Sequence, residues 1–110
     1  MKRETTRRLR DAHSACLAIA SFTEGQDWSD YQQSLLLQSA VERQLEIVGE
    51  ALNVAVAEDP ALFALIPTLR AFVGLRHRIA HGYDVIDDEI VWDTVRVDIP
   101  DLAKLIDAIF

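Results

Sequence analysis

The sequence predicts an all-α fold, a bundle of four to five helices in up-down order. Apolar residues recur at intervals of three and four along most of the chain, which is the period of an amphipathic helix. No stretch shows a sustained alternation of apolar and polar residues with hairpin turns at its ends. The length of 110 residues suits one domain, so we expect a single unit over residues 1–110.

The first helix is expected over residues 4–22, where one face gathers Leu9, Ala12, Cys16, Ile19 and Ala20. The second is expected over residues 30–57, with Ser29 as its N-cap and Asp30 in the first turn. Apolar residues cover most of the girth of this second helix, so it should be buried on two sides. Either the rest of the chain or a second copy could cover the further side, and we favour a homodimer.

Gly49 lies inside the second predicted helix, where a glycine costs about 1 kcal/mol relative to alanine. A close approach of another helix would explain it, and we expect the dimer seam nearby. Glu42 and Glu50 lie two turns apart on the same helix. We interpret them as solvent-exposed or dimer salt-bridge partners, with a catalytic carboxylate pair as the alternative.

The middle of the chain is divided by proline. Asp59-Pro60 ends the second helix or starts a short one, and Pro67 marks a further boundary. A third main helix is expected over residues 68–81, with Gly82 as the residue that terminates it.

The last helix is expected from about residue 89 to 109, with Asp87 or Asp88 as its cap. Pro100 interrupts its apolar stripe and cannot donate a backbone hydrogen bond. We therefore expect a kink or a restart there, with Asp98 as a possible cap.

Charge and cysteine content restrict the classes of function. The net charge of −7 argues against a broad, non-specific nucleic-acid binder. RNA would have to bind a local basic patch around Arg76 and Arg78, helped by the N-terminal arginines.

Cys16 is the single cysteine, so no disulfide can form within the chain. With no apolar run long enough for a membrane span or a secretion signal, we expect a cytoplasmic protein with no membrane partner.

The segment from Arg76 to Tyr83 is the candidate site, because it gathers two arginines, two histidines and a tyrosine at a helix end. On a helix, His77 and His81 lie within about 40° of each other, whereas Arg76 and His81 are about 140° apart. Arg76 and His81 can meet at one reaction centre in three ways: the arginine bends across, the helix loosens near Gly82, or a second subunit completes the site.

These side chains suit phosphodiester cleavage in RNA. A histidine moves protons near neutral pH, and an arginine stabilises charge that develops on a phosphate. Attack by the ribose 2′-hydroxyl would leave a 2′,3′-cyclic phosphate and needs no metal. His77 and His81 also have the spacing of zinc ligands, with Asp84 as a third, but Arg76 and Arg78 would repel a cation. We therefore predict no metal and no cofactor.

The Arg76, His77 and His81 pattern resembles the HEPN signature, and Tyr83 extends it to the R-x4-H-x-Y pattern of HepT-like proteins. Residues 41–51 are similar to the second-helix stretch of that family, with its Glu-Arg and Ile/Val-Gly-Glu-Ala. Residues 84–92 and 100–102 resemble its C-terminal helix. The chain departs from the family at two positions: His77 replaces the usual asparagine, and Thr68 replaces an aromatic residue.

The resemblance implies a HEPN-like ribonuclease toxin that acts as a homodimer, with the two R-x4-H motifs facing each other across a composite cleft. It implies catalytic roles for Arg76, His81 and His77. It also implies a partner, an MntA-like minimal nucleotidyltransferase antitoxin that transfers AMP to Tyr83. Arg78 is an expected contact to the RNA backbone. The alternatives are a non-catalytic helical module that docks and regulates the nucleotidyltransferase, and a structural helical dimer without a site.

Overall fold

A computed structural model describes residues 1–82 and 86–110 of the chain. Within these two ranges the secondary structure is helical and contains no strand, which confirms the all-α prediction. The helices are α1 (Arg3–Thr23), α2 (Trp28–Gln33), α3 (Leu35–Glu58), α4 (Leu62–Leu65), α5 (Leu69–His81), α6 (Asp88–Asp93), the π-helical segment η2 (Thr94–Asp98) and α7 (Ile99–Ile109). No helix of the described ranges is both long and apolar enough to cross a membrane.

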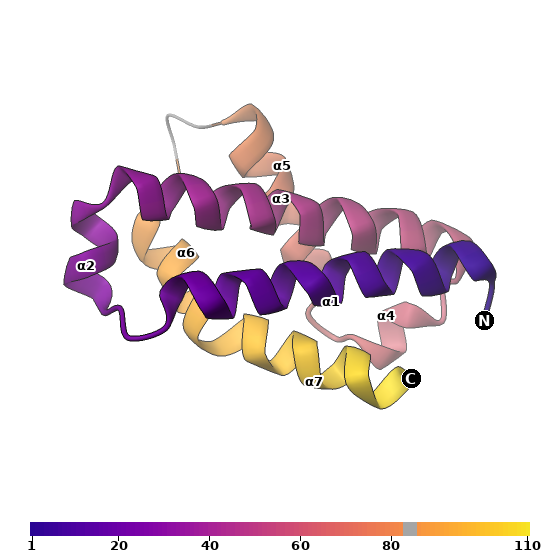
Figure 1. The fold of residues 1–110 in the computed structure, drawn as a ribbon. Helices are drawn as coiled ribbons and strands as arrows, with labels where there is room; N and C mark the ends of the chain where they lie inside the picture. Colours follow the sequence, from indigo (N-terminus) through magenta and orange to yellow (C-terminus); the bar gives the residue numbers. More distant parts are fainter. Residues whose placement is uncertain (83–85) are drawn as a thin grey trace.

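The long helices α1, α3 and α7 form an up-down arrangement (Figure 1). Helix α3 runs antiparallel to α1, and α7 packs along α1 in the opposite direction to it. Helix α5 packs across α3, and its C-terminal end projects beyond α3 (Figure 1). The part of the chain that carries the candidate motif therefore stands out from the body of the bundle.

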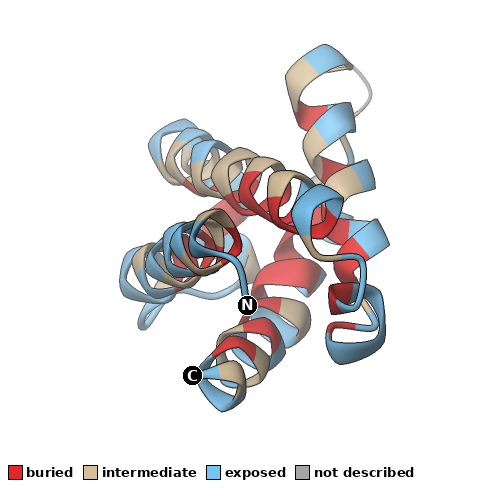
Figure 2. Ribbon diagram, turned by 90° about the vertical axis from the view of Figure 1, so that its right-hand side faces the viewer, coloured by how far each residue is buried: buried red, intermediate tan, exposed pale blue. Residues whose placement is uncertain are grey.

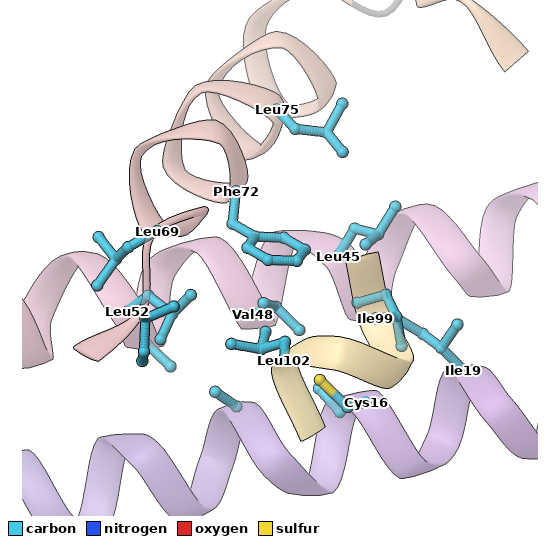
Figure 3. Packing of buried hydrophobic residues seen from close by; sticks show 14 of the residues in the cluster. Cys16, Ile19, Leu45, Val48, Leu52, Leu69, Phe72, Leu75, Ile99 and Leu102 are labelled. Carbon is cyan, nitrogen blue, oxygen red and sulfur yellow. The ribbon is translucent and has the colours of Figure 1, made fainter. Parts of the chain in front are cut away.

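The core lies where α3 meets α1, α5 and α7, and buried faces turn inward from each of these helices (Figure 2). Figure 3 labels residues of this core: Cys16, Ile19, Leu45, Val48, Leu52, Leu69, Phe72, Leu75, Ile99 and Leu102. Burial of such side chains contributes roughly 1.5–3 kcal/mol each to folding. The two-sided burial expected of the second helix is thus provided within one chain, by α1 and α5, and the homodimer stays a prediction.

The predicted second helix is divided in two at Ser34, and Ser29 is not its N-cap. Asp27 caps α2 instead, in a capping box where Asp27 and Asp30 each accept a backbone hydrogen bond of 2.9 Å from the other. Ser34 then caps α3 by accepting a hydrogen bond of 3.0 Å from the Leu37 N–H. The break lets α2 turn so that Tyr31 is fully buried, a tertiary effect that helical periodicity does not reveal.

The predicted third main helix is α5, which begins one residue later than expected, at Leu69. Gly82 ends it as predicted, and its N–H donates a hydrogen bond of 2.8 Å to the Arg78 carbonyl oxygen. Gly82 has a φ of −135°, so the helix ends without a left-handed residue. Between α3 and α5, the Asp59-Pro60 turn leads into the short helix α4.

The predicted last helix has a π-helical turn, η2, before Pro100. Because proline has no N–H, the regular hydrogen-bond ladder cannot continue at that position. The Ile99 N–H instead donates to the Thr94 carbonyl, five residues back, and Pro100 then occupies the first turn of α7. Asp87 caps α6 as predicted. Asp98 occupies the N-cap position of α7, as expected of a restart, but its backbone is helical and its side chain makes no capping hydrogen bond.

Candidate active site on α5

The orientation of α5 is set by its apolar face. Leu69, Phe72, Leu75 and Ile79 are buried, and Figure 3 shows the ring of Phe72 between α5 and α3. Core packing thereby determines where the polar residues between them lie. Arg76 is half-buried, whereas His77, Arg78 and His81 are exposed.

Arg76 turns back toward α3. Its Nη2 lies 3.1 Å from Oε2 of Glu50, and 33% of the Arg76 side chain is exposed. Together with Glu50, Arg76 lines a groove of about 420 Å³ formed by α1, α3 and α5. Neither His77 nor His81 lines this groove.

Glu50 was not predicted from the sequence as a partner of Arg76; the alternative to a salt-bridge role was a catalytic carboxylate pair with Glu42. We interpreted it as a solvent-exposed or dimer salt-bridge residue, but its partner is Arg76 of the same chain. The signal that could have found it is the preceding residue, Gly49. A Cβ at position 49 would overlap the Arg76 Cβ and lie 2.9 Å from the Phe72 carbonyl oxygen. The close helix approach predicted at Gly49 therefore occurs within one chain, and Gly49 gives no separate evidence for a dimer seam.

His77 and His81 lie together on the projecting end of α5. Their ring centroids are 4.9 Å apart, and the ring planes are inclined by 52°. This agrees with the helical geometry expected from their spacing of four residues. Both imidazoles are exposed, so a substrate could reach them without movement of the bundle.

Arg76 and His81 are not brought to one point within the chain. Helix α5 continues regularly to His81, so it does not loosen before Gly82. Arg76 bends toward Glu50 on α3 and not along α5 toward the histidines. Of the three ways in which the two residues could meet, completion by a second subunit is the one that this geometry leaves open.

Arg78 points to another side of α5. It lines a groove of about 200 Å³ toward α6 and η2, with Leu75, Ile90 and Asp98 among the lining residues. The two arginines of the expected basic patch, Arg76 and Arg78, therefore line different grooves. Tyr83, the predicted modification site, and Asp84, the possible third metal ligand, lie outside the described residues.

The groove that contains Arg76 carries both signs of charge. Its lining includes three arginines and three carboxylates: Arg8, Arg43, Arg76, Asp11, Glu46 and Glu50. Because Arg8 lines this groove, one of the N-terminal arginines lies beside Arg76; Arg8 also donates a hydrogen bond of 2.9 Å to Glu4. Hydrogen bonds from Arg7 and then Arg8 lower the pKa of Glu4.

Across the described ranges, no group of three His, Cys, Asp or Glu side chains is arranged to hold a metal ion.

Comparison with known proteins identifies the family. The family model described as "Ribonuclease HepT-like" matches residues 12–109. The chain is 34% identical over 102 residues to "Probable ribonuclease HepT" of Thermococcus cleftensis, covering 93% of this chain and 92% of that protein. It is 29% identical over 108 residues to "Putative RNase MJ1380" of Methanocaldococcus jannaschii, covering 98% of each chain.

A second Methanocaldococcus jannaschii protein, "Putative RNase MJ0125", is 29% identical over 103 residues, with 94% of this chain and 88% of that protein covered. No solved structure shows a significant match. The family model spans α3, α5 and α7 and most of α1, the helices that build the core and position Arg76 and His81. The chain therefore belongs to the HepT-like ribonuclease family.

Proposed function

We propose that this chain is a metal-independent endoribonuclease toxin of a HEPN toxin–antitoxin pair, and that it cleaves RNA at a composite site in a homodimer. The observation that carries the proposal is the exposed imidazole pair. The ring centroids of His77 and His81 lie 4.9 Å apart on α5, and these histidines come one and five residues after Arg76. Membership of the HepT-like ribonuclease family supports RNA as the substrate.

The reaction uses groups that these residues supply. The 2′-oxygen of a ribose attacks the adjacent phosphorus while the His81 imidazole accepts its proton. Arg76 stabilises the negative charge that develops on the phosphorane oxygens. A second imidazole, such as that of His77, gives a proton to the departing 5′-oxygen. The products are a 2′,3′-cyclic phosphate and a 5′-hydroxyl.

A second copy of the chain supports this chemistry by completing the site. Within one chain Arg76 turns toward Glu50, and His81 is exposed on the projecting end of α5. Two such ends that face each other would bring the arginine of one copy to the histidine of the other. Arg78 would contact the RNA backbone from the side of α5 that faces α6.

The proposed antitoxin is an MntA-like minimal nucleotidyltransferase that transfers AMP to Tyr83. Tyr83 follows His81 by two residues in the sequence. An AMP group there adds bulk and a phosphate charge next to the motif. The added phosphate competes with RNA for the arginine donors.

The direct test is to incubate the purified protein with end-labelled RNA in EDTA and to identify the fragment ends. Cyclic phosphate ends should appear with the wild type and be lost in His81→Ala and Arg76→Ala. His13→Ala is the matched control, because His13 lies on α1 with its Nε2 2.9 Å from Asp107 on α7. If folded protein without tyrosine modification cleaves none of several RNA classes, the ribonuclease proposal is wrong.

The second candidate is a non-catalytic module that docks and regulates the nucleotidyltransferase. The observation that favours it is the engagement of Arg76 by Glu50, away from the histidines, within one chain. Expression in cells separates the two candidates. Growth arrest that alanine at 76 or 81 relieves supports the ribonuclease, whereas an effect that both variants retain, with the complex still formed, supports the module.

A further inference from the structure

We propose that Glu50 is a positioning residue for Arg76, and that Gly49 and Glu50 together fix where the Arg76 guanidinium stands. The inference rests on the proposed ribonuclease function and assigns a role to a carboxylate that the reaction itself does not use. Its basis is a contact between two helices that are distant in sequence, α3 and α5.

The first step concerns the stem of Arg76. The Cβ of Arg76 lies over the α3 backbone at Gly49, so closely that no side chain could occupy position 49. On the α5 side, the ring of Phe72 is buried in the core, and its carbonyl oxygen also lies close to Gly49. The starting point of the Arg76 side chain is therefore set by backbone packing.

The second step concerns the guanidinium. Glu50 follows Gly49 directly, and its Oε2 lies 3.1 Å from Arg76 Nη2. A guanidinium has five N–H donors, so a carboxylate at Nη2 leaves other donors to face a phosphate. The ion pair thus orients the Arg76 guanidinium and leaves some of its N–H donors available to a phosphate.

The third step concerns the other charges of the groove. Arg8 is paired with Glu4 at 2.9 Å, and Arg43 lies 4.0 Å from Glu46. Each of these arginines has its own carboxylate, and within the described ranges Glu50 is the carboxylate that pairs with Arg76. Glu50 is 46% exposed, and such exposed pairs add little to folding stability. Its contribution therefore lies in restricting the Arg76 side chain, which would otherwise sample many rotamers.

The consequence is a loss of rate rather than of RNA affinity when the Glu50 charge is removed. Arg76 would still be present, but fewer molecules would hold its guanidinium in the position that meets the reacting phosphate. A misplaced catalytic group lowers the rate of the chemical step by large factors. We expect Glu50→Gln to lower the maximal single-turnover rate by about 10-fold, with less than about a twofold change in the half-saturating RNA concentration.

The experiment compares Glu50→Gln and Glu50→Asp with Glu46→Gln, in single-turnover cleavage of labelled RNA in EDTA. Glu46→Gln is the matched control, because Glu46 lies one turn earlier on α3 and lines the same groove. It should stay within about twofold of the wild type, and Glu50→Asp should retain part of the rate. In an Arg76→Lys background, Glu50→Gln should lose most of its effect, since the two residues act through one contact.

A second readout follows the pair without catalysis. The NMR signal of the Arg76 side-chain Nε–Hε group, assigned by its loss in Arg76→Lys, should shift in Glu50→Gln and not in Glu46→Gln. An unshifted signal, a wild-type rate in Glu50→Gln, or a faster rate overturns the proposal; the last would mean that Glu50 competes with phosphate for Arg76. Absence of cleavage by the wild type refutes the ribonuclease and with it the role of Glu50, while the NMR signal still reports whether the pair exists.

Discussion

Arg76 of α5 crosses α3 directly above Gly49, and the space between them admits no side chain at position 49. This contact joins the segment that resembles the second helix of the family to the segment that carries the R-x4-H motif. It fixes both the depth at which α5 packs on α3 and the direction from which Arg76 reaches Glu50. The two proposals above therefore depend on how closely these two helices pack.

We expect Gly49→Ala to destabilise the fold, because the new Cβ overlaps Arg76 and approaches the Phe72 carbonyl oxygen. Overpacking of this kind costs about 1–3 kcal/mol, against a gain of about 1 kcal/mol from the better helix former. Gly74→Ala is the control, since nothing lies within 4 Å of a Cβ at position 74 of α5. It should stabilise the protein by roughly 0.5–1 kcal/mol. Urea unfolding of the two variants measures the difference, and equal free energies of unfolding would contradict the close approach.

We expect Arg78→Ala to weaken RNA binding without slowing cleavage at saturation. Arg78 lines the groove toward α6, away from Arg76, so its charge can act on the RNA backbone but not on the reacting phosphate. Loss of one phosphate contact to single-stranded RNA should reduce the slope of log K against log salt by about 0.7. Arg70→Ala serves as the control. Arg70 is also on α5, but its guanidinium packs 4.1 Å from the ring centroid of Phe63 on α4. Identical salt slopes for the two variants would remove Arg78 from the RNA interface.

We expect Glu42→Gln to raise the melting temperature at pH 7 and to have little effect near pH 4. Burial, and then the charges of Asp88 and Glu46, raise the pKa of Glu42. A raised carboxyl pKa means that the folded state favours the protonated form. The stability linked to Glu42 is thus fully present below its unfolded pKa and is lost as the pH rises through the folded value.

A glutamine stays neutral throughout, so its advantage should grow from pH 4 to pH 7. Thermal unfolding at both pH values checks this. Glu24→Gln, on an exposed residue in the turn after α1, provides the comparison. An advantage of glutamine at position 42 that does not change with pH would argue against the buried charge as its cause.

We expect Ser34→Ala to cost about 1 kcal/mol of stability, because it removes the side chain that caps α3. Ser29, the N-cap that the sequence suggested, only accepts a hydrogen bond of 2.9 Å from the Gln33 side chain. Ser29→Ala should therefore change stability by less than about 0.5 kcal/mol. Chemical unfolding of both variants decides the matter, and a larger cost at position 29 would mean that the helix break at Ser34 is wrong.

The helical class, the end of α5 at Gly82 and the family could all be predicted from the amino-acid sequence, because these depend on local features. Periodicity places the apolar face of a helix, and a spacing of four residues brings His77 and His81 together wherever the helix packs. The cap at Asp87 is local in the same sense, since its side chain reaches N–H groups two and three residues on.

The helix break at Ser34 and the partner of Arg76 could not be predicted from the sequence, because both depend on contacts between distant parts of the chain. The break allows Tyr31 to be buried. Its ring centroid lies 5.2 Å from that of Trp92, a residue far along the chain. Arg76 meets Glu50 because α5 and α3 approach closely at Gly49, a contact between segments 26 residues apart in number. Helical periodicity specifies the faces of each helix but not which faces meet, since that choice depends on how the side chains of the whole core fit together.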